Sequence, residues 1–570
     1  GDKAETSALN KVFSSGRNDK LIIGSVKTNI GHLEAAAGVS GLLKAILCLK
    51  NGKIPANLNF ETPNPEIPFD TMCLKVPTET QEWPRKNKTK YIGVNGFGYG
   101  GTNAHIIISE APQLQNSYVG TDEDSTSPLL LPLSAKSNDS LKALAGQYKD
   151  FLESGNVTTG KFLRRVSTKR NHYDRRALIF ASNKQELLER LELFSKNTPG
   201  AGIVSAEPAS APGKLTFVYS GMGPQWWGMG QELLISEPLF AQKIKEYDEV
   251  FQKISGWSLL EEMQSSEENS RVAKTDVAQP MNFAVQAALT EVWRSWGIEP
   301  DAVVGHSVGE VTSAYVSGIL SLEEALLVSY HRSRLQGSLA NTGGMLAVGL
   351  SEKAVQTYLS DYPEHVSIAA INSPHAVTLA GQQASLDELA AIFQQNNIFN
   401  RALQVEVPYH SPLMAPIEAE IKHCLASIKP QQAKIPCYST VSGELAQAND
   451  YDADYWWHNV RESVQFAKTI ETLCENDLHS FLEVGPHPVL NSSMKEILSE
   501  KGIDGHVYSS LNRKTPEQAT LLNSLGLLYA HGYELNWNAI QKAEDSYFQL
   551  PTYPWQKSPY TYGSPKFFQD

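Results

Sequence analysis

Hydrophobic and polar positions alternate along this chain in blocks that predict an α/β protein. A short apolar run at residues 129–133 predicts a strand, and apolar positions at helical spacing predict helices over residues 137–152 and 183–194. Between residues 343 and 404 the pattern predicts three strands and two helices, at residues 344–349, 367–371 and 376–380 and at residues 352–359 and 386–394. We expect this second block to be a small ferredoxin-like subdomain, with a ligand cleft beside it.

An apolar strand at residues 301–304 runs directly into Gly305-His306-Ser307-Val308-Gly309. A strand, a Gly-x-Ser-x-Gly turn and a helix-compatible segment are typical of a nucleophile elbow, which exposes a serine hydroxyl on a tight turn. The following helix would present its positive end to Ser307. The motif alone also occurs as an ordinary turn, but the strand before it favours a nucleophile.

The next predicted helix begins with the capping box Ser321-Leu322-Glu323-Glu324. Arg332 falls within the apolar stripe of this helix, whereas Arg334 points the opposite way. A buried guanidinium needs a compensating partner, because isolated buried charge is costly. Two partners stay open: a structural carboxylate of the chain, or the free carboxylate of a substrate.

A serine nucleophile needs a base, and the chain has 14 histidines. We choose His410, in Val407-Pro408-Tyr409-His410-Ser411-Pro412, because it follows a strand-like stretch in a turn-rich segment. Spacing alone does not separate it from His375 or His458.

Ser307, Arg332 and His410 together resemble the acyltransferase domain of type I fatty acid and polyketide synthases. Landmarks in the same order lie at residues 217–226, 455–459 and 481–488. The Gly-Met-Gly form around Met222, where bacterial relatives usually have Gly-Gln-Gly, points to animal fatty acid synthase and animal synthase-like polyketide synthases.

The resemblance implies ping-pong transfer of an acyl group from a CoA thioester. Ser307 would attack the thioester while His410 removes its proton, and the backbone N–H groups of Met222 and Val308 would hold the oxyanion. Arg332 would bind the carboxylate of a malonyl-type group. By the same resemblance, further substrate-site positions fall on Gln225, His306, Tyr409 and Asn459, and the backbone carbonyl of Asn459 orients His410. The acyl group would then pass to the phosphopantetheine arm of an acyl carrier protein domain, with no cofactor or metal bound by the chain itself.

The extender unit stays open between malonyl and methylmalonyl. Residues 407–410 match neither the His-Ala-Phe-His pattern of malonyl relatives nor the Tyr-Ala-Ser-His pattern of methylmalonyl relatives. Bulky Tyr409 and Val308 resemble malonyl enzymes, whereas Pro408 fixes its own backbone angle and can re-aim Tyr409 to leave room for a methyl branch. One methyl changes binding by only about 1–3 kcal/mol.

Two other classes of function share some of these features. A serine hydrolase or thioesterase of the α/β-hydrolase type has the same elbow, but it predicts a carboxylate partner for His410 and no buried arginine. The third class is a non-catalytic scaffold fragment.

Residues 1–112 carry a separate signature. The segments at residues 25–34 and 96–105 resemble the C-terminal part of a β-ketoacyl synthase of the thiolase-like fold. In that family the residues matching Lys27 and His32 help to decarboxylate the extender and stabilise its enolate, and Tyr99 replaces a gating phenylalanine. A satisfied core pair is the alternative for Lys27 and His32. Because the nucleophilic cysteine of the family lies upstream, we expect no condensation by this chain alone. The missing ketosynthase part would be a partner, in a parent that is a homodimer.

These signatures predict a partial ketosynthase at 1–112, a small α/β linker domain at 113–212, an α/β-hydrolase-like acyltransferase at 213–505 and a linker at 506–570. The stretch at residues 115–127 is polar.

A basic run predicts a solvated face or a docking patch for a carrier protein or CoA, and it comprises Arg164, Arg165, Lys169, Arg170, Arg175 and Arg176. The proline- and aromatic-rich tail at residues 548–557 resembles a segment that wraps back toward the synthase domain, and a disordered terminus is the alternative.

The composition of the chain narrows the class of protein further. At 570 residues and 41% hydrophobic content, the chain suffices for several cores. A net charge of −13 without a recognition motif argues against nucleic acid, and no apolar run is long enough to predict a membrane span. Five scattered cysteines without metal-ligand spacing fit a reducing, cytoplasmic environment.

Overall fold

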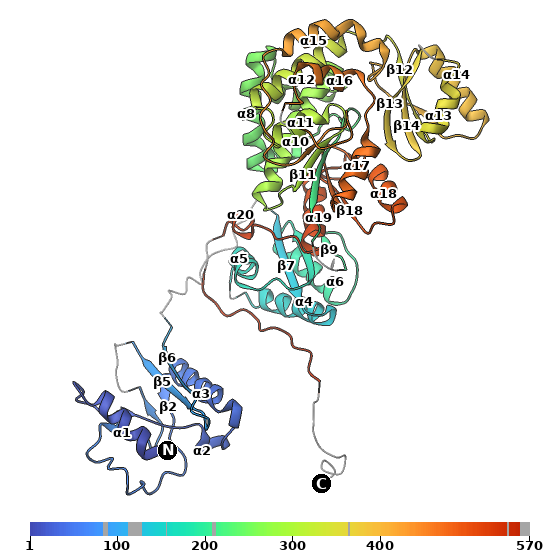
Figure 1. The fold of residues 1–570 in the computed structure, drawn as a ribbon. Coiled ribbons are helices and arrows are strands. Elements are labelled where there is room, and N and C mark those ends of the chain that lie inside the picture. The colour runs from blue at the N-terminus through green and yellow to red at the C-terminus, as the bar shows by residue number, and fades with distance from the viewer. Residues whose placement is uncertain are drawn as a thin grey trace. The chain divides into compact units, whose positions relative to one another are not determined.

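The computed structural model describes residues 1–83, 89–111, 128–155, 157–207, 212–362, 365–447, 449–543 and 546–558 (Figure 1). The chain divides into two compact units, residues 1–115 and 116–570. Both mix helices and strands, so the expected α/β class is confirmed. The polar stretch at residues 115–127 lies outside the described residues. Each helix that the structure describes is too short or too polar to cross a bilayer.

The first unit is built on an antiparallel hairpin of β5 (Tyr91–Phe97) and β6 (Asn103–Ser109), against which α3 (Ala37–Asn51) packs. Its other elements are α1 (Asp2–Phe13), β1 (Leu21–Ile22), α2 (Lys27–Ile30), η1 (Glu34–Ala36), β2 (Lys53–Ile54), β3 (Leu74–Lys75) and β4 (Gln81–Glu82). Large apolar side chains of α3 and β6 are exposed, among them Val39 (61%), Leu47 (56%) and Ile107 (68%). This unit therefore presents an apolar surface that a complete globular domain would bury.

The predicted linker elements are confirmed in the next part of the chain. Strands β7 (Leu129–Ala135), β8 (Arg175–Ala181) and β9 (Ile203–Ser205) form one antiparallel sheet in the order β7-β8-β9. Its helices are α4 (Asn138–Glu153), α5 (Thr159–Lys169) and α6 (Lys184–Ser195). The side chains of Ser137 and Asn183 accept backbone N–H groups and so fix the starts of α4 and α6.

The C-terminal segment 546–558 packs on this linker domain rather than hanging free. Phe548 and Leu550 enter the core of the domain, and the Tyr553 hydroxyl accepts a hydrogen bond from the backbone N–H of Lys136 at 2.8 Å. The disordered alternative is thus wrong for the described part of the tail.

The basic run binds the chain's own C-terminal backbone. Its arginines donate to carbonyl oxygens as follows: Arg164 to Asn538 and Gln541, Arg165 to Ser546 and Phe548, Arg170 to Pro551, and Arg176 to Tyr533. A carbonyl is a neutral acceptor, so these bonds add to the apolar contacts without requiring acidic partners in the tail. The expectation of a solvated face is therefore wrong for Arg164, Arg165 and Arg176, whereas Arg170 is exposed, and docking of a carrier protein or CoA stays a prediction.

The core of the chain after residue 212 is a parallel sheet in the order β16-β11-β10-β17-β18, with β10 (Leu215–Tyr219) at its centre. The other strands are β11 (Ala302–Gly305), β16 (Cys437–Tyr438), β17 (Ser480–Val484) and β18 (His506–Ser509). Side chains alternate along β10: Phe217 packs with the cluster of α8, α10 and α12, whereas Val218 packs with the cluster of α17 and α18. Helices thus cover both faces of the sheet.

The helices of this core surround the sheet and carry most of the site. They are α7 (Gln231–Ser236), α8 (Pro238–Ser255), α9 (Leu259–Met263), η2 (Glu267–Asn269), α10 (Thr275–Ser295), α11 (Gly309–Val316), α12 (Leu322–Gly337), η3 (Pro412–Ile417), α15 (Glu418–Leu425), α16 (Ala453–Arg461), α17 (Phe466–Glu475), α18 (Asn491–Glu500), α19 (Glu517–Ala530) and α20 (Trp537–Ile540). The predicted capping box of Ser321 and Glu324 opens α12.

The inserted subdomain has the expected ferredoxin-like arrangement, to one side of the core in Figure 1. Its elements are β12 (Gly344–Val348), α13 (Glu352–Leu359), β13 (Val366–Ser373), β14 (Ala376–Gly381), α14 (Gln383–Gln395) and β15 (Asn400–Ala402), and the antiparallel sheet order is β13-β14-β12-β15. The three-residue β15 was not predicted. Backbone bonds of Val464 to Ala369 and Ile371, each 2.9 Å, tie the insert to the core.

Candidate active site

Ser307 stands on the turn between β11 and α11 with a positive φ of 54°, and its Oγ lies 2.6 Å from Nε2 of His410. The flanking glycines are required by close backbone approach. A Cβ on Gly305 would overlap the backbone nitrogen of Glu310, and one on Gly309 would overlap the carbonyl of Tyr219. The motif therefore forms the strained elbow that its sequence predicts.

The tautomer of His410 follows from its second contact. Nδ1 lies 2.8 Å from the carbonyl oxygen of Glu462, which can only accept, so Nδ1 carries the hydrogen and Nε2 is free to accept from Ser307. Burial, with the positive charge of Arg332 nearby, lowers the pKa of His410 to about 3. The imidazole is therefore neutral and able to take a proton.

The expectation that the backbone carbonyl of Asn459 orients His410 is wrong, because Glu462 holds that place. Asn459 contributes its side chain instead. Its Oδ1 accepts from Nε of Arg332 and its Nδ2 donates to the carbonyl of Ser307, each at 3.1 Å. The buried amide thus joins the guanidinium to the backbone of the nucleophile.

Arg332 is 1% exposed, and its Nη2 donates to Oγ of Ser307 at 3.1 Å. Its Nη1 donates to the amide oxygens of Gln279 at 2.7 Å and Gln336 at 3.0 Å. Among the residues described, no carboxylate forms an ion pair with this guanidinium, so the structural salt bridge is wrong. Burial lowers its pKa to about 10, which leaves it charged at neutral pH. A cation whose hydrogen-bond partners are all neutral therefore lies against the nucleophile.

The two expected oxyanion donors belong to two segments that meet at Ser307. Val308 follows it in the chain, and Met222 follows Gly221, where an added Cβ would lie 3.4 Å from Cβ of Ser307. In the described parts of the chain, neither backbone N–H donates to a protein acceptor. Two unused N–H groups near a serine hydroxyl suit a tetrahedral oxyanion.

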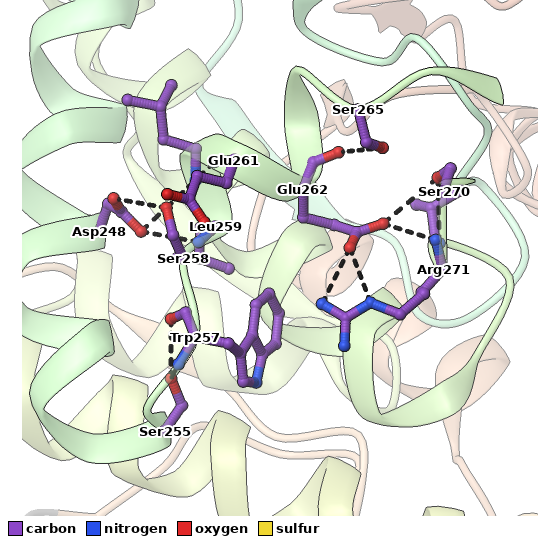
Figure 2. A network of polar contacts seen from close by, with 12 residues as sticks. Asp248, Ser255, Trp257, Ser258, Leu259, Glu261, Glu262, Ser265, Ser270 and Arg271 are labelled. Atoms are coloured by element: carbon purple, nitrogen blue, oxygen red, sulfur yellow. Dashed lines mark hydrogen bonds and ion pairs between the residues drawn. The ribbon is translucent and has the colours of Figure 1, made fainter. Parts of the chain in front are cut away.

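The loop carrying Met222 is braced by its neighbours. Gln225 Oε1 accepts the backbone N–H of Gly223 at 2.8 Å, and Trp227 Nε1 donates to the carbonyl of Ser265 at 2.9 Å. Figure 2 shows the network beyond Ser265, in which buried Asp248 accepts from Leu259 N at 2.7 Å and buried Glu262 accepts from Arg271 N at 2.6 Å. Gln225 therefore braces the loop at Gly223, and Trp227 ties the following residues to the network of Figure 2 at Ser265.

His306 and Tyr409 each contact a residue that the sequence did not single out. Nε2 of His306 lies 2.8 Å from Oδ1 of Asn372, on β13 of the insert, and burial lowers the pKa of His306. The hydroxyl of Tyr409 lies 2.7 Å from Oγ1 of Thr275, at the start of α10. Both residues thus link the reacting groups to surrounding elements.

The expected ketosynthase residues lie in the first unit. Lys27 and His32 are exposed, and Nδ1 of His32 accepts the backbone N–H of Glu34 at 2.9 Å. Tyr99 is fully exposed. The reading of Lys27 and His32 as a satisfied core pair is wrong, and within the described residues they line no enclosed site.

Sequence reasoning missed Gln279, Gln336 and Glu462. For Gln279 the sequence did contain a signal. Polar residues recur at helical spacing on α10, otherwise rich in buried apolar side chains: Thr275, Gln279, Asn282, Gln286 and Thr290. A polar stripe inside a buried helix indicates hydrogen-bonding partners.

Comparison with known protein families gives three matches along the chain. The acyl transferase domain matches residues 216–533, the beta-ketoacyl synthase C-terminal domain matches residues 1–61, and the ketoacyl-synthetase C-terminal extension matches residues 63–177. The first match alone covers more than half of the chain.

Two multidomain synthases are similar over nearly the whole chain. Erythronolide synthase EryA2 of Saccharopolyspora erythraea is 35% identical over 565 residues, 98% of this chain and 16% of that protein. The highly reducing polyketide synthase sdnO of Sordaria araneosa is 35% identical over 594 residues, 97% of this chain and 19% of that protein. The chain thus spans less than a fifth of the length of these relatives.

Solved structures agree with this placement. The acyltransferase domain from module 8 of the salinomycin polyketide synthase matches with a TM-score of 0.69 and 31% identity, over 72% of this chain and 98% of that one. The acyl transferase domain of SpnD, in complex with 2-(pent-4-yn-1-yl)malonyl, matches with a TM-score of 0.63 and 25% identity, over 72% and 98%. The chain belongs to the acyl transferase domain family and carries that domain behind the C-terminal part of a β-ketoacyl synthase, as in a type I polyketide synthase.

Proposed function

We propose that this chain loads a malonyl-type extender unit from CoA onto the phosphopantetheine thiol of an acyl carrier protein domain, through an ester on Ser307. The observation that carries the proposal is Arg332, a buried cation with neutral protein partners 3.1 Å from the nucleophile. A diacid thioester supplies the missing negative charge at its far end. The SpnD domain was solved with a substituted malonyl group, which supports the same class of substrate here.

The reaction follows from the contacts of His410. As Oγ of Ser307 forms its bond to the thioester carbon, Nε2 of His410 takes the hydroxyl proton, and the N–H groups of Met222 and Val308 stabilise the oxyanion. When the C–S bond breaks, the proton passes to the departing CoA sulfur. The carrier thiol then attacks the ester by the same steps in reverse and restores the Ser307 hydroxyl.

The serine-hydrolase alternative is less well supported. It predicts a carboxylate on His410 and no buried arginine, whereas His410 contacts a backbone carbonyl and Arg332 is buried beside Ser307. Both differences favour a transferase that selects a charged acyl group.

We further propose that the parent protein is an animal synthase-like polyketide synthase, on the single feature of Met222 in the oxyanion loop. Its carrier protein domain, the rest of its ketosynthase and a second copy of the parent would be the partners. Lys27, His32 and Tyr99 would act only in the completed ketosynthase.

Intact-mass measurement after incubation with malonyl-CoA tests the loading step. We expect a malonyl adduct on the wild-type chain, none on Ser307→Ala, and transfer of the adduct to added phosphopantetheinylated carrier protein. Arg332→Ala should lose the malonyl adduct, whereas Arg334→Ala, an exposed arginine two residues along, should keep it. A wild-type chain that releases malonate without loading the carrier would be a hydrolase. One that forms no adduct would be a scaffold.

A further inference from the structure

We infer that Thr275 is a specificity-determining positioning residue: by its bond to Tyr409 it holds the phenol ring against the α-carbon of the bound extender and favours malonyl over its α-branched analogues. This inference rests on the proposed loading reaction and names the member of the substrate class that the site selects.

The hydrogen bond between these residues has a defined direction. Oε2 of Glu406 lies 3.2 Å from the backbone nitrogen of Thr275 and 3.4 Å from its Oγ1. A carboxylate only accepts, so the Thr275 hydroxyl turns its hydrogen toward Glu406 and accepts the Tyr409 hydroxyl at 2.7 Å. Thr275 and Tyr409 are 1% and 4% exposed, so water does not compete for this bond.

A tight turn aims the ring inward. The backbone N–H of Tyr409 donates to the carbonyl of Val407 at 3.0 Å, which closes a three-residue turn centred on Pro408. The fixed angle of Pro408 therefore directs Tyr409 into the buried cluster instead of away from it.

The contacts of Tyr409 connect it to both ends of the proposed acyl site. The Tyr409 hydroxyl also interacts with Gln279, whose amide oxygen holds Nη1 of Arg332 at 2.7 Å. The next residue, His410, contacts Ser307. A malonyl group esterified to Ser307 with its carboxylate on Arg332 would have its middle carbon between these two residues, and Tyr409, which precedes His410 and whose hydroxyl interacts with Gln279, would be its neighbour. A methyl on that carbon requires the ring to move, and the Thr275 bond resists that movement.

Helix α10, which begins at Thr275, also carries a matched control pair. Thr290 and Tyr219 are both fully buried, and their hydroxyls lie 3.0 Å apart. Thr290 is 15 residues beyond Thr275, about 22 Å along the helix axis. Removing its hydroxyl breaks the same kind of bond without touching the ring of Tyr409.

The test is competition between equal malonyl-CoA and methylmalonyl-CoA for Ser307 of the full chain, read as the ratio of the two adducts by intact mass. We expect a malonyl preference in the wild type that falls about five- to tenfold in Thr275→Val, which is at or below the lower end of the roughly 10–200-fold that one methyl group can provide, because the ring itself is kept. Thr290→Val should keep the wild-type ratio.

Tyr409→Phe removes the same hydrogen bond from the other side and keeps the ring. It should shift the ratio as Thr275→Val does, and the double variant should shift it no further. Tyr409→Phe therefore tests the role of the Thr275–Tyr409 bond even if Thr275→Val does not fold. A wild-type preference for methylmalonyl, an unchanged ratio in Tyr409→Phe, or an equal shift in Thr290→Val overturns the inference while loading itself stands. A wild type that takes neither extender overturns the proposed function and this inference together.

Discussion

Nδ1 of His410 lies 2.8 Å from the carbonyl oxygen of Glu462, where a serine protease has a carboxylate. The carbonyl selects the same tautomer as an aspartate does, but it brings no negative charge into the site. That arrangement suits a pocket in which a substrate carboxylate has to bind nearby, because a second anion would repel it.

The role of Glu462 predicts tolerance of side-chain changes at this position. The side chain is 54% exposed and only the backbone carbonyl faces His410. Glu462→Ala should therefore load malonyl within about twofold of wild type in a single-turnover assay, whereas His410→Ala should lose about 10³-fold or more. A loss of more than tenfold in Glu462→Ala would show that the side chain takes part.

The lowered pKa of His410 predicts a flat acid limb in the pH profile. With a pKa of about 3 in the folded chain, His410 stays neutral through the range in which an ordinary histidine, at about 6.5, becomes protonated. The loading rate at saturating malonyl-CoA should therefore not drop between pH 7.5 and 5.5. A titration of that rate near pH 6.5 would show that the base is solvated.

The same pKa predicts a pH-dependent difference in stability. Above pH 6.5 His410 is neutral in both folded and unfolded chains. As the pH falls from 6.5 toward 3, the unfolded chain gains a proton that the folded chain does not, so the folded state loses stability. In urea unfolding followed at the acyltransferase domain, His410→Gln should lose less stability than wild type from pH 7 to 5. An equal loss in both would contradict the burial of a neutral imidazole.

The neutral surroundings of Arg332 predict that lysine cannot replace it. Gln279, Gln336 and Asn459 take three directions of a planar guanidinium, which an ammonium group does not offer. Arg332→Ala should reduce malonyl loading by about 10²-fold or more, as expected for a buried charge partner, and should reduce acetyl loading less. Arg332→Lys should recover no more than a small part of the malonyl loading that Arg332→Ala loses. Full recovery would mean that charge alone selects the extender.

The contacts of Arg165 predict a protease-sensitive tail when they are removed. Its guanidinium donates to the carbonyls of Ser546 and Phe548 at 3.2 and 2.9 Å. Arg165→Ala should speed chymotryptic cleavage between residues 546 and 558 several-fold. Arg175→Ala, which removes a surface pair with Glu207, is the matched control and should leave the rate unchanged. Equal rates in all three chains would show that apolar packing alone holds the tail.

Local signals in the sequence were enough to predict Ser307, the inserted subdomain and the helix that carries Arg332, because elbows, caps and periodicities are encoded within a few residues. The partner of His410 could not be predicted, since every residue has a backbone carbonyl. Gln279 and Gln336 lie on different helices and meet only through packing. β15 is too short to show an alternating pattern. The arginines of α5 resembled a surface patch because their acceptors are backbone atoms nearly 400 residues away.

The bonds from those arginines have a consequence for building hybrid synthases. Main-chain oxygens are present whatever side chains the tail carries, so these bonds tolerate changes of sequence, whereas the packing of Phe548 and Leu550 and the bond of Tyr553 do not. A chimaera that takes the acyltransferase from one synthase and the following segment from another should therefore tolerate a junction beyond residue 558. A junction before residue 546 would instead combine α5 of one synthase with the tail of another, and the foreign tail would then have to place its carbonyl groups at the same arginines.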